Sequence, residues 1–340
     1  MAFTMMPLTA SAETAADDAA GNGGAGEDAV RDVPVQLHNP SIAGDGTATW
    51  DCIYFGKYFY VAAEGSTLKG DIRWRVLEVS DTDGDGVLDD AFLMADRSVD
   101  FRKYNEEYHG VTWETCTLRS WLNGYDADVN LEGVDYSEGN SKGNSNFIDE
   151  AFNDDEKAAL KTTNVINGKN PASGSDCGRN TQDKVFLLSA QEMTEEKYGF
   201  VVQGDDKYGS RSRNRISKTT YYVAGNIKRI YNGDGDKDKP RNYWLRTTNG
   251  GWSAVLAMYD GRVNTEGWNV DGVHGFWEAP PLVRPAIHID ISDTSLWTYA
   301  GTCASDDTDK LGITDVTIPK ETCIYDGTDG VEFTPEPTVR

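Results

Sequence analysis

The chain has 340 residues and a net charge of −24, because 56 Asp and Glu residues outnumber 32 Lys and Arg residues. This charge disfavours a nucleic-acid partner, since few positive side chains remain to neutralise phosphate groups. No apolar run approaches the roughly 20 residues that span a bilayer. The length allows one large domain or two smaller ones.

The first 45 residues have the composition of an export signal followed by a linker. Residues 1–12 are mildly apolar and end in the cleavage pattern Ala10-Ser11-Ala12, so we interpret them as the remnant of a signal peptide. The alternative is an unstructured leader. Residues 13–45 open with a stretch that contains almost no large apolar side chain, and they are predicted to be a disordered acidic linker.

Short strands are predicted where apolar residues alternate or form compact runs. Ile72, Trp74 and Val76 alternate with arginines, which is the period-two pattern of a half-buried strand. Other runs of this kind occupy residues 50–60, 91–95, 185–188, 243–248 and 283–290.

An acidic loop between two of these strands has the spacing of a calcium site. Asp81, Asp83 and Asp85 occupy alternate positions, as in the loop of an EF-hand, although the Glu expected at its end is missing. Such oxygens suit a hard cation, so we predict a structural Ca²⁺ site of weak affinity, roughly 10⁻⁴–10⁻³ M. The alternative is a solvated acidic hairpin tip. The candidate ligands are Asp81, Asp83, Asp85, Asp89 and Asp90, with the carbonyl group of Val87.

Helices are predicted at three places among the strands. Leu118 and Trp121 fall on one helical face that ends at Gly124, a typical C-cap residue. Further helices are predicted to begin at Asn153 and Ser189, each followed three residues later by Glu. A few helices among short strands predict an α+β domain over residues 46–297.

The segment between residues 250 and 279 combines many glycines with aromatic and charged side chains. Glycines at this density indicate sharp turns, and aromatic and Arg side chains dominate recognition surfaces. We therefore interpret the segment as an irregular binding face held between two buried strands. The alternative is that its tryptophans belong to the core. The candidate ligand-binding residues are Trp252, Ser253, Met258, Tyr259, Arg262, Asn264, Glu266, Trp268, Asn269, Asp271, His274, Phe276 and Trp277.

Cysteine and histidine spacing gives little indication of catalysis. The five cysteines have no C-x-x-C spacing, which disfavours zinc and leaves one or two disulfides open if the chain is exported. The four histidines are scattered, and His288 alternates with isoleucines as a packed strand residue would. In so acidic a chain a glycosidase-like carboxylate pair also stays open.

Residues 298–340 change in character and are predicted to be a linker and the first strands of a truncated immunoglobulin-like repeat.

Five short motifs, in order between residues 50 and 290, resemble an uncharacterised domain of secreted proteins in Gram-positive gut bacteria. That domain is similar to a divergent C-type lectin-like fold, the superfold shared with formylglycine-generating enzymes and with the variable proteins of diversity-generating retroelements. The motifs are Ile72–Leu77, Thr112-Trp113 with Leu118–Asn123, Asp183–Ser189, Trp244–Thr247 and Val283–Ala286.

The resemblance implies a C-type lectin-like fold of short strands, two or three helices and long loops, whose last strands carry the ligand face. It implies a bacterial protein, secreted or on the cell surface, that binds a protein or glycan ligand of a host or bacterial surface without catalysis. A face diversified by a retroelement is one form of this hypothesis. The alternatives are a structural spacer in a multidomain adhesin and, third, an enzyme. A formylglycine-generating activity is disfavoured because no cysteine lies between Cys177 and Cys303.

Overall fold

The computed structural model describes residues 35–59, 68–138, 145–202, 204–231, 233, 235–272 and 279–306, and the backbone of 316–317 and 338–339. The chain divides into two units, Met1–Val35 and Gln36–Arg340, and every element named below belongs to the second. The predicted signal remnant, most of the linker and most of the immunoglobulin-like repeat therefore lie outside the described residues.

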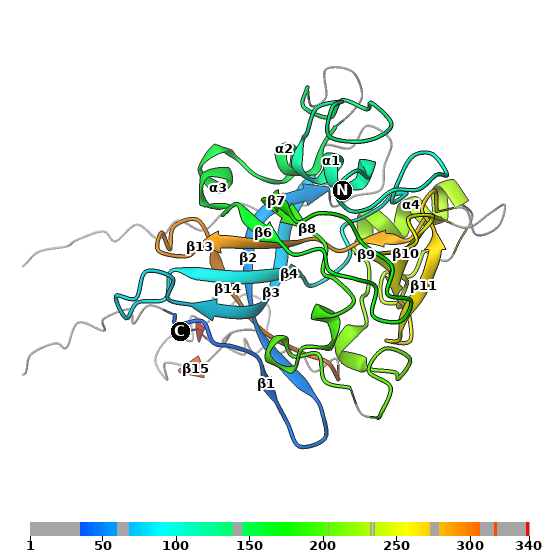
Figure 1. Cartoon of the computed structure of the whole chain (residues 1–340). Helices are drawn as coiled ribbons and strands as arrows, with labels where there is room; N and C mark the ends of the chain where they lie inside the picture. The colour runs from blue at the N-terminus through cyan, green and yellow to red at the C-terminus, as the bar shows by residue number, and fades with distance from the viewer. Residues whose placement is uncertain are drawn as a thin grey trace, which may run out of the picture. The chain divides into compact units, whose positions relative to one another are not determined.

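The larger sheet is antiparallel throughout (Figure 1). Its long strands β2 and β3 bury alternate side chains, as the period-two pattern predicts. In spatial order it contains β1 (Ser41–Ile42), β2 (Ala48–Phe59), β3 (Lys69–Ser80), β4 (Asp90–Ala95), β13 (Ala286–Asp290) and β8 (Val185–Phe186), and β14 (Thr298–Ala304) pairs with β2.

The smaller sheet contains β11 (Val263–Asn269), β10 (Ser253–Ala257), β9 (Tyr243–Asn249), β12 (Leu282–Val283) and β5 (Asp100–Phe101) in spatial order. The prediction of a single strand over residues 283–290 was wrong. The chain leaves β12 in the smaller sheet, passes Arg284 and Pro285, and enters β13 in the larger sheet. A break at this place has a physical reason, because proline has no N–H group for a ladder hydrogen bond. Two further pairs join β6 (Thr163–Val165) to β7 (Thr181–Asp183) and β15 (Val316–Thr317) to β16 (Thr338–Val339).

The described helices are short, and three of the predicted capping signals are present. Helix α1 ends at Gly124 with φ 66°, and Asn153 and Glu156 form a reciprocal capping box. Ser189 and Glu192 also bond reciprocally, but they begin a 3₁₀ turn instead of an α-helix. The helices are α1 (Thr117–Asn123), α2 (Phe147–Ala151), α3 (Asp154–Ala159) and α4 (Tyr221–Tyr231), with 3₁₀ turns η2 (Glu192–Thr194), η3 (Glu196–Tyr198) and η4 (Arg213–Arg215).

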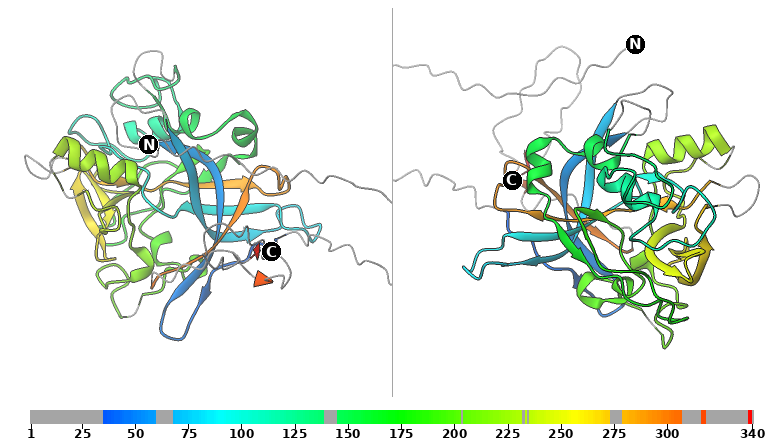
Figure 2. Two further views of the ribbon diagram at one scale, coloured as in Figure 1. Left: turned by 180° about the vertical axis from the view of Figure 1, so that it is seen from behind. Right: turned by 45° about the horizontal axis from the view of Figure 1, so that its top comes forward.

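The described elements confirm a mixed α+β architecture. Figure 2 shows α1 and α2 near one end of β2, whereas α4 lies beside the smaller sheet. Helix α3 leads to Leu160, which forms a bridge to Ile289 in β13. The longest described helix, α4, has 11 residues, and no helix of the described ranges is long and apolar enough to cross a membrane.

Tryptophans form much of the core between these elements. Trp50, Trp74, Trp113, Trp121 and Trp244 are each less than 2 % exposed, so the predicted burial of Trp74, Trp121 and Trp244 is confirmed. Burying an indole N–H group is unfavourable unless it finds an acceptor. Four of the five donate to one, as when Trp74 donates to the carbonyl oxygen of Phe55 at 2.7 Å.

The folded unit extends beyond the predicted boundaries at both ends. Residues 41–42, expected to be linker, form β1, and residues 298–304, also expected to be linker, form β14. Within β14, Ala300 and Cys303 are buried against β2, so the apolar residues of this segment complete the core of the domain. Thr49 of β2 pairs with Ser41 in β1 and with Ala304 in β14.

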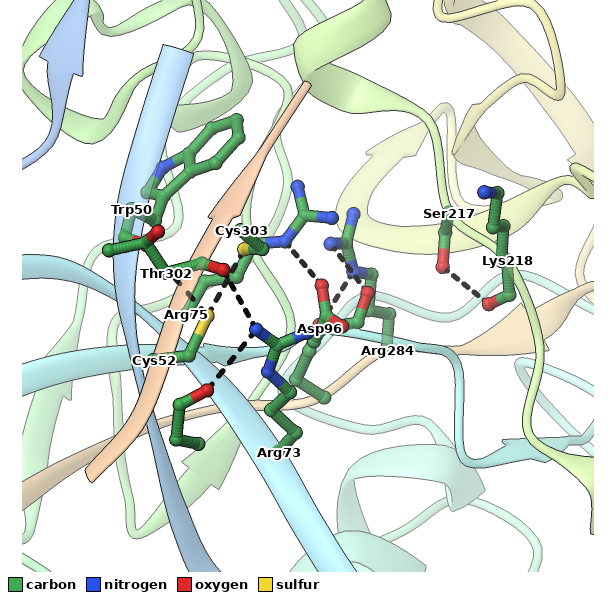
Figure 3. A network of polar contacts seen from close by, with 12 residues as sticks. Trp50, Cys52, Arg73, Arg75, Asp96, Ser217, Lys218, Arg284, Thr302 and Cys303 are labelled. Carbon is green, nitrogen blue, oxygen red and sulfur yellow. Dashed lines mark hydrogen bonds and ion pairs between the residues drawn. The ribbon is translucent and has the colours of Figure 1, made fainter. Parts of the chain in front are cut away.

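A buried carboxylate joins the two sheets (Figure 3). Asp96 follows β4 and accepts a hydrogen bond from Nε of Arg75 at 2.7 Å, and its second oxygen lies 3.5 Å from Arg73. Arg284, at the crossing between the sheets, donates to the carbonyl oxygens of Ala95 and Asp96. Burial alone would raise the pKa of Asp96, but the attraction of Arg75 and Arg73 outweighs it and lowers this pKa to about 2.

Beside this network the thiol of Cys52 lies 3.1 Å from the sulfur of Cys303, and burial raises the pKa of Cys52. The four cysteines of the described ranges form no disulfide, and Cys323 lies outside these ranges.

We expect Asp96→Asn to destabilise the fold. The folded pKa lies below the ordinary value of 3.8, so the ionised carboxylate stabilises the folded state above that pH, and this contribution is lost as the pH falls through about 2. The variant should lose on the order of 2 kcal/mol or more of the free energy of unfolding at pH 7, and the loss should shrink toward pH 2. Urea unfolding at several pH values measures both quantities.

The matched control is Asp71→Asn, because the side chain of Asp71 is 54 % exposed and pairs with Lys57. This control should change stability little at any pH. An Asp96→Asn variant as stable as the parent at pH 7 would contradict the role given to the network.

Candidate ligand-binding site

Within the segment predicted to be a binding face, residues 253–257 and 263–269 form the strands β10 and β11, which continue an antiparallel meander that begins with β9. Its glycines provide turns and one bulge. Gly250 and Gly251 lie between β9 and β10, and Gly261 lies in the turn before β11. Gly267 interrupts β11 with φ 75°, where a Cβ atom would lie 2.3 Å from the carbonyl oxygen of Ala254. The glycine density therefore marked tight turns between strands and a bulge within one.

The meander contributes two aromatic residues to a hollow of about 390 Å³ beside α4, which we call the α4 hollow. Tyr259 comes from the turn between β10 and β11, and Trp268 comes from β11. Helix α4 supplies Ile227 and Tyr231 to the same wall, and Pro281 comes from the segment before β12. The hollow thus brings together residues as far apart in the chain as Ile227 and Leu282.

The polar groups of the α4 hollow come from the loop that precedes β9. Lys239, Arg241 and Asn242 line it, and the side-chain oxygen of Asn242 accepts the backbone N–H of Tyr259 at 2.8 Å. This bond holds the turn with Tyr259 against the loop while the tyrosine side chain stays 54 % exposed. Trp268 is half-buried and packs against the core. The hollow therefore combines aromatic walls with cationic and amide donors.

Trp252, also predicted to bind ligand, lies elsewhere. Its ring lies 5.1 Å from the ring of Tyr108, and both side chains are about half exposed, at 49 % and 50 %. Trp252 lies close to Gly110, and neither Trp252 nor Tyr108 lines the α4 hollow.

Other predicted residues occupy a third place. A hollow of about 490 Å³, which we call the β11 hollow, is lined by residues of β11 and the preceding turn together with Ala172 and residues 206, 208 and 209. At its edge Nε of Arg262 pairs with Asp260 at 2.9 Å. Ser253 and Asn269 are opposite one another in the β10–β11 ladder, and Asp271 follows β11. The predicted residues that line the β11 hollow are Met258, Arg262, Asn264 and Glu266. His274, Phe276 and Trp277 lie outside the described residues. The predicted set therefore does not line a single cavity.

Sequence reasoning missed the α4 side of the hollow. The sequence did carry a signal, since Val223 and Ile227 are buried four residues apart on one face of α4. The loop residues Lys239, Arg241 and Asn242 carry no comparable signal, because only the fold brings them to the hollow.

Three histidines pair with carboxylates at separate places. His38 lies 3.0 Å from Asp51, His109 pairs with Glu132, and His288 lies 2.9 Å from Asp90. The ring of His288 also stacks on Phe92 with centroids 4.5 Å apart, as expected of a packed strand residue. Across the described ranges no serine, threonine or cysteine side chain bonds to these imidazoles, so they do not form a triad of the serine-protease type.

The acidic loop brings together part of the predicted calcium site. Asp81, Asp83 and Asp85 offer oxygens within 4.8 Å of one another. The carboxylate of Asp81 accepts the N–H groups of Gly86 and Gly84, which lower its pKa. The three carboxylates are thus close enough to share one cation, although exposed acidic groups are also common without one.

The remaining predicted ligands of this site do not join the cluster. Asp89 accepts from Thr82 and lies 3.5 Å from Lys161, and Asp90 pairs with His288. Asp90 is the first residue of β4 and pairs with Asp290 and Ser80 in the sheet. Val87 contributes its N–H to Asp85.

The family of the domain of unknown function DUF6273 matches residues 88–291, and the chain belongs to this family. The matched residues include the α4 hollow and Asp96, but they begin after Asp81, Asp83 and Asp85 and end before β14. Searches of curated proteins and of solved structures gave no match.

We expect millimolar calcium to raise the melting temperature, because a cation bound only by the folded state stabilises it by mass action. The double variant Asp83→Asn, Asp85→Asn should abolish the shift, and thermal unfolding with calcium or with chelator measures it. The prediction is contradicted if calcium leaves the melting temperature of the parent chain unchanged, or if it shifts that of the double variant equally.

Proposed function

We propose that the domain is a non-catalytic binding module with a divergent C-type lectin-like fold, and that its ligand occupies the α4 hollow. The observation that carries this proposal is the convergence of Trp268, Tyr259 and Tyr231 on one hollow. Known ligand sites are concave, largely apolar and aromatic, with a few placed polar groups, and commonly have volumes of about 300–1,000 Å³. The volume of about 390 Å³ lies in this range.

The chemistry of the walls favours a saccharide. A pyranose ring has an apolar C–H face that packs against an aromatic ring, and hydroxyl groups at its edge that need hydrogen-bond partners. Tyr259 offers an exposed ring, and Lys239, Arg241 and Asn242 offer donors close by. Aromatic side chains also lose little conformational entropy when they bind.

A surface location is the natural setting for such a module. We propose that the protein acts outside the bacterial cell, secreted or attached to its surface, and that the saccharide belongs to a host or bacterial surface. The supporting observations are the net charge of −24 and the export pattern near Ala10-Ser11-Ala12.

We expect Tyr259→Ala and Trp268→Ala each to weaken saccharide binding by on the order of 2 kcal/mol, because aromatic anchors in a hollow carry much of the binding energy. A glycan array probed with the whole chain would identify the ligand, and titration calorimetry would measure the affinities. Tyr259→Ala should leave the melting temperature unchanged, since this side chain is exposed.

The matched control is Tyr108→Ala, which removes an aromatic ring of similar exposure that lies outside the α4 hollow. An equal loss of binding in this control would show that the ligand lies at the Tyr108–Trp252 pair. If no glycan binds, or if peptides bind instead, the saccharide proposal fails; if nothing binds, a structural spacer replaces the binding module.

A further inference from the structure

A second hollow, of about 230 Å³, lies beside the buried network of Asp96, and we call it the Asp96 hollow. Arg75, Arg97, Arg213 and Lys218 line it together with Asp96 and Asp306. Four cationic groups thus face two carboxylates in a chain whose net charge is −24. A local excess of positive charge on so acidic a protein points to an anionic ligand.

Asp96, one of the two carboxylates that line this hollow, and Asp238, which pairs with the lining residue Arg97, are each engaged by an arginine. Asp96 bonds to Arg75 and also lies near Arg73, and Figure 3 shows both of these arginines and Arg284 converging on it. Asp238 pairs with Arg97 at 3.0 Å. Two half-buried arginines, Arg73 and Arg75, and the buried Arg284 thus surround one carboxylate, which leaves positive charge that a second anion would compensate.

Arg75 is held in place for such an anion. Its Nε atom donates to Asp96 and its guanidinium group lies over the ring of Trp50 at 4.6 Å. No acceptor among the described residues bonds to its two terminal nitrogens, although its side chain is only 12 % exposed. These N–H groups are therefore fixed donors at the wall of the hollow.

Arg213 provides a second donor from another segment. It lies in η4, is exposed, and has no ion pair with any described residue. Arg97 comes from the segment after β4, and Lys218 comes from the segment after η4. The donors therefore reach the hollow from separate parts of the fold.

We propose that the Asp96 hollow binds a tetrahedral oxyanion, a phosphate or sulfate group that is either free or esterified. A planar carboxylate is matched by a single guanidinium fork, whereas a tetrahedral group offers oxygens in several directions to donors from several segments. The proposal concerns a site other than the α4 hollow, so it does not depend on the saccharide proposal.

Titration calorimetry at low ionic strength tests this site with inorganic phosphate and inorganic sulfate. We expect saturable binding at one site that weakens as salt is added. Arg213→Gln should reduce the affinity about tenfold or more, because it removes a charge-assisted hydrogen bond. This variant should fold normally, since Arg213 is exposed and forms no ion pair within the described ranges. Lys218→Gln gives a second, independent measurement.

The matched control is Arg229→Gln, which removes an exposed arginine that bonds only to Asn226 among the described residues. It should bind phosphate as the parent chain does. Tighter binding of phenyl phosphate than of inorganic phosphate would identify an esterified ligand, and the reverse order would identify the free ion.

The proposal is overturned if neither inorganic ion binds, if acetate binds as tightly as phosphate, or if Arg213→Gln leaves the affinity unchanged. Trp268→Ala should not alter phosphate binding, so the two sites can succeed or fail separately.

Discussion

The structure depends above all on the compensation of one buried negative charge. Asp96 lies where the last residue of β4, the two arginines of β3 and the crossing at Arg284 meet. An isolated buried carboxylate would destabilise the folded state. Removing one partner of a buried ion pair destabilises a protein more than replacing the whole pair with apolar residues, because the remaining charge is left without compensation. Because Arg284 also lies 3.3 Å from the hydroxyl group of Tyr243 in β9, the same network orients the smaller sheet against the larger one.

The frame of the domain was largely predictable because its signals are local. Period-two burial identified β3, and the reciprocal bonds of Asn153 with Glu156 identified α3, since side chains a few residues apart report directly on backbone conformation. The strand β14 was not predicted, because it forms only by pairing with β2, some 250 residues earlier in the chain. The division of residues 283–290 between two sheets was not predictable either, because it depends on which strands they pair with and not on their amino-acid composition.

The candidate site was only partly predictable, for a related reason. Aromatic residues near Tyr259 and Trp268 were recognised by their type. The type of a side chain does not, however, determine to which face of the sheet it points. The meander distributed the predicted residues among three places, and α4 with the loop before β9 completed one of them. In the Asp81 loop, by contrast, sequence spacing and spatial proximity coincide for three aspartates, because a tight loop leaves little freedom.

The pairing of β1 and β14 on opposite edges of β2 has a mechanical consequence. Both strands are antiparallel to β2, so they run in the same direction, and Thr49 faces residue 41 on one side and residue 304 on the other. Tension applied through the two ends of the domain would pull these strands in opposite directions along a common axis. The hydrogen bonds between β14 and β2 would then bear the load together in shear, rather than opening one after another.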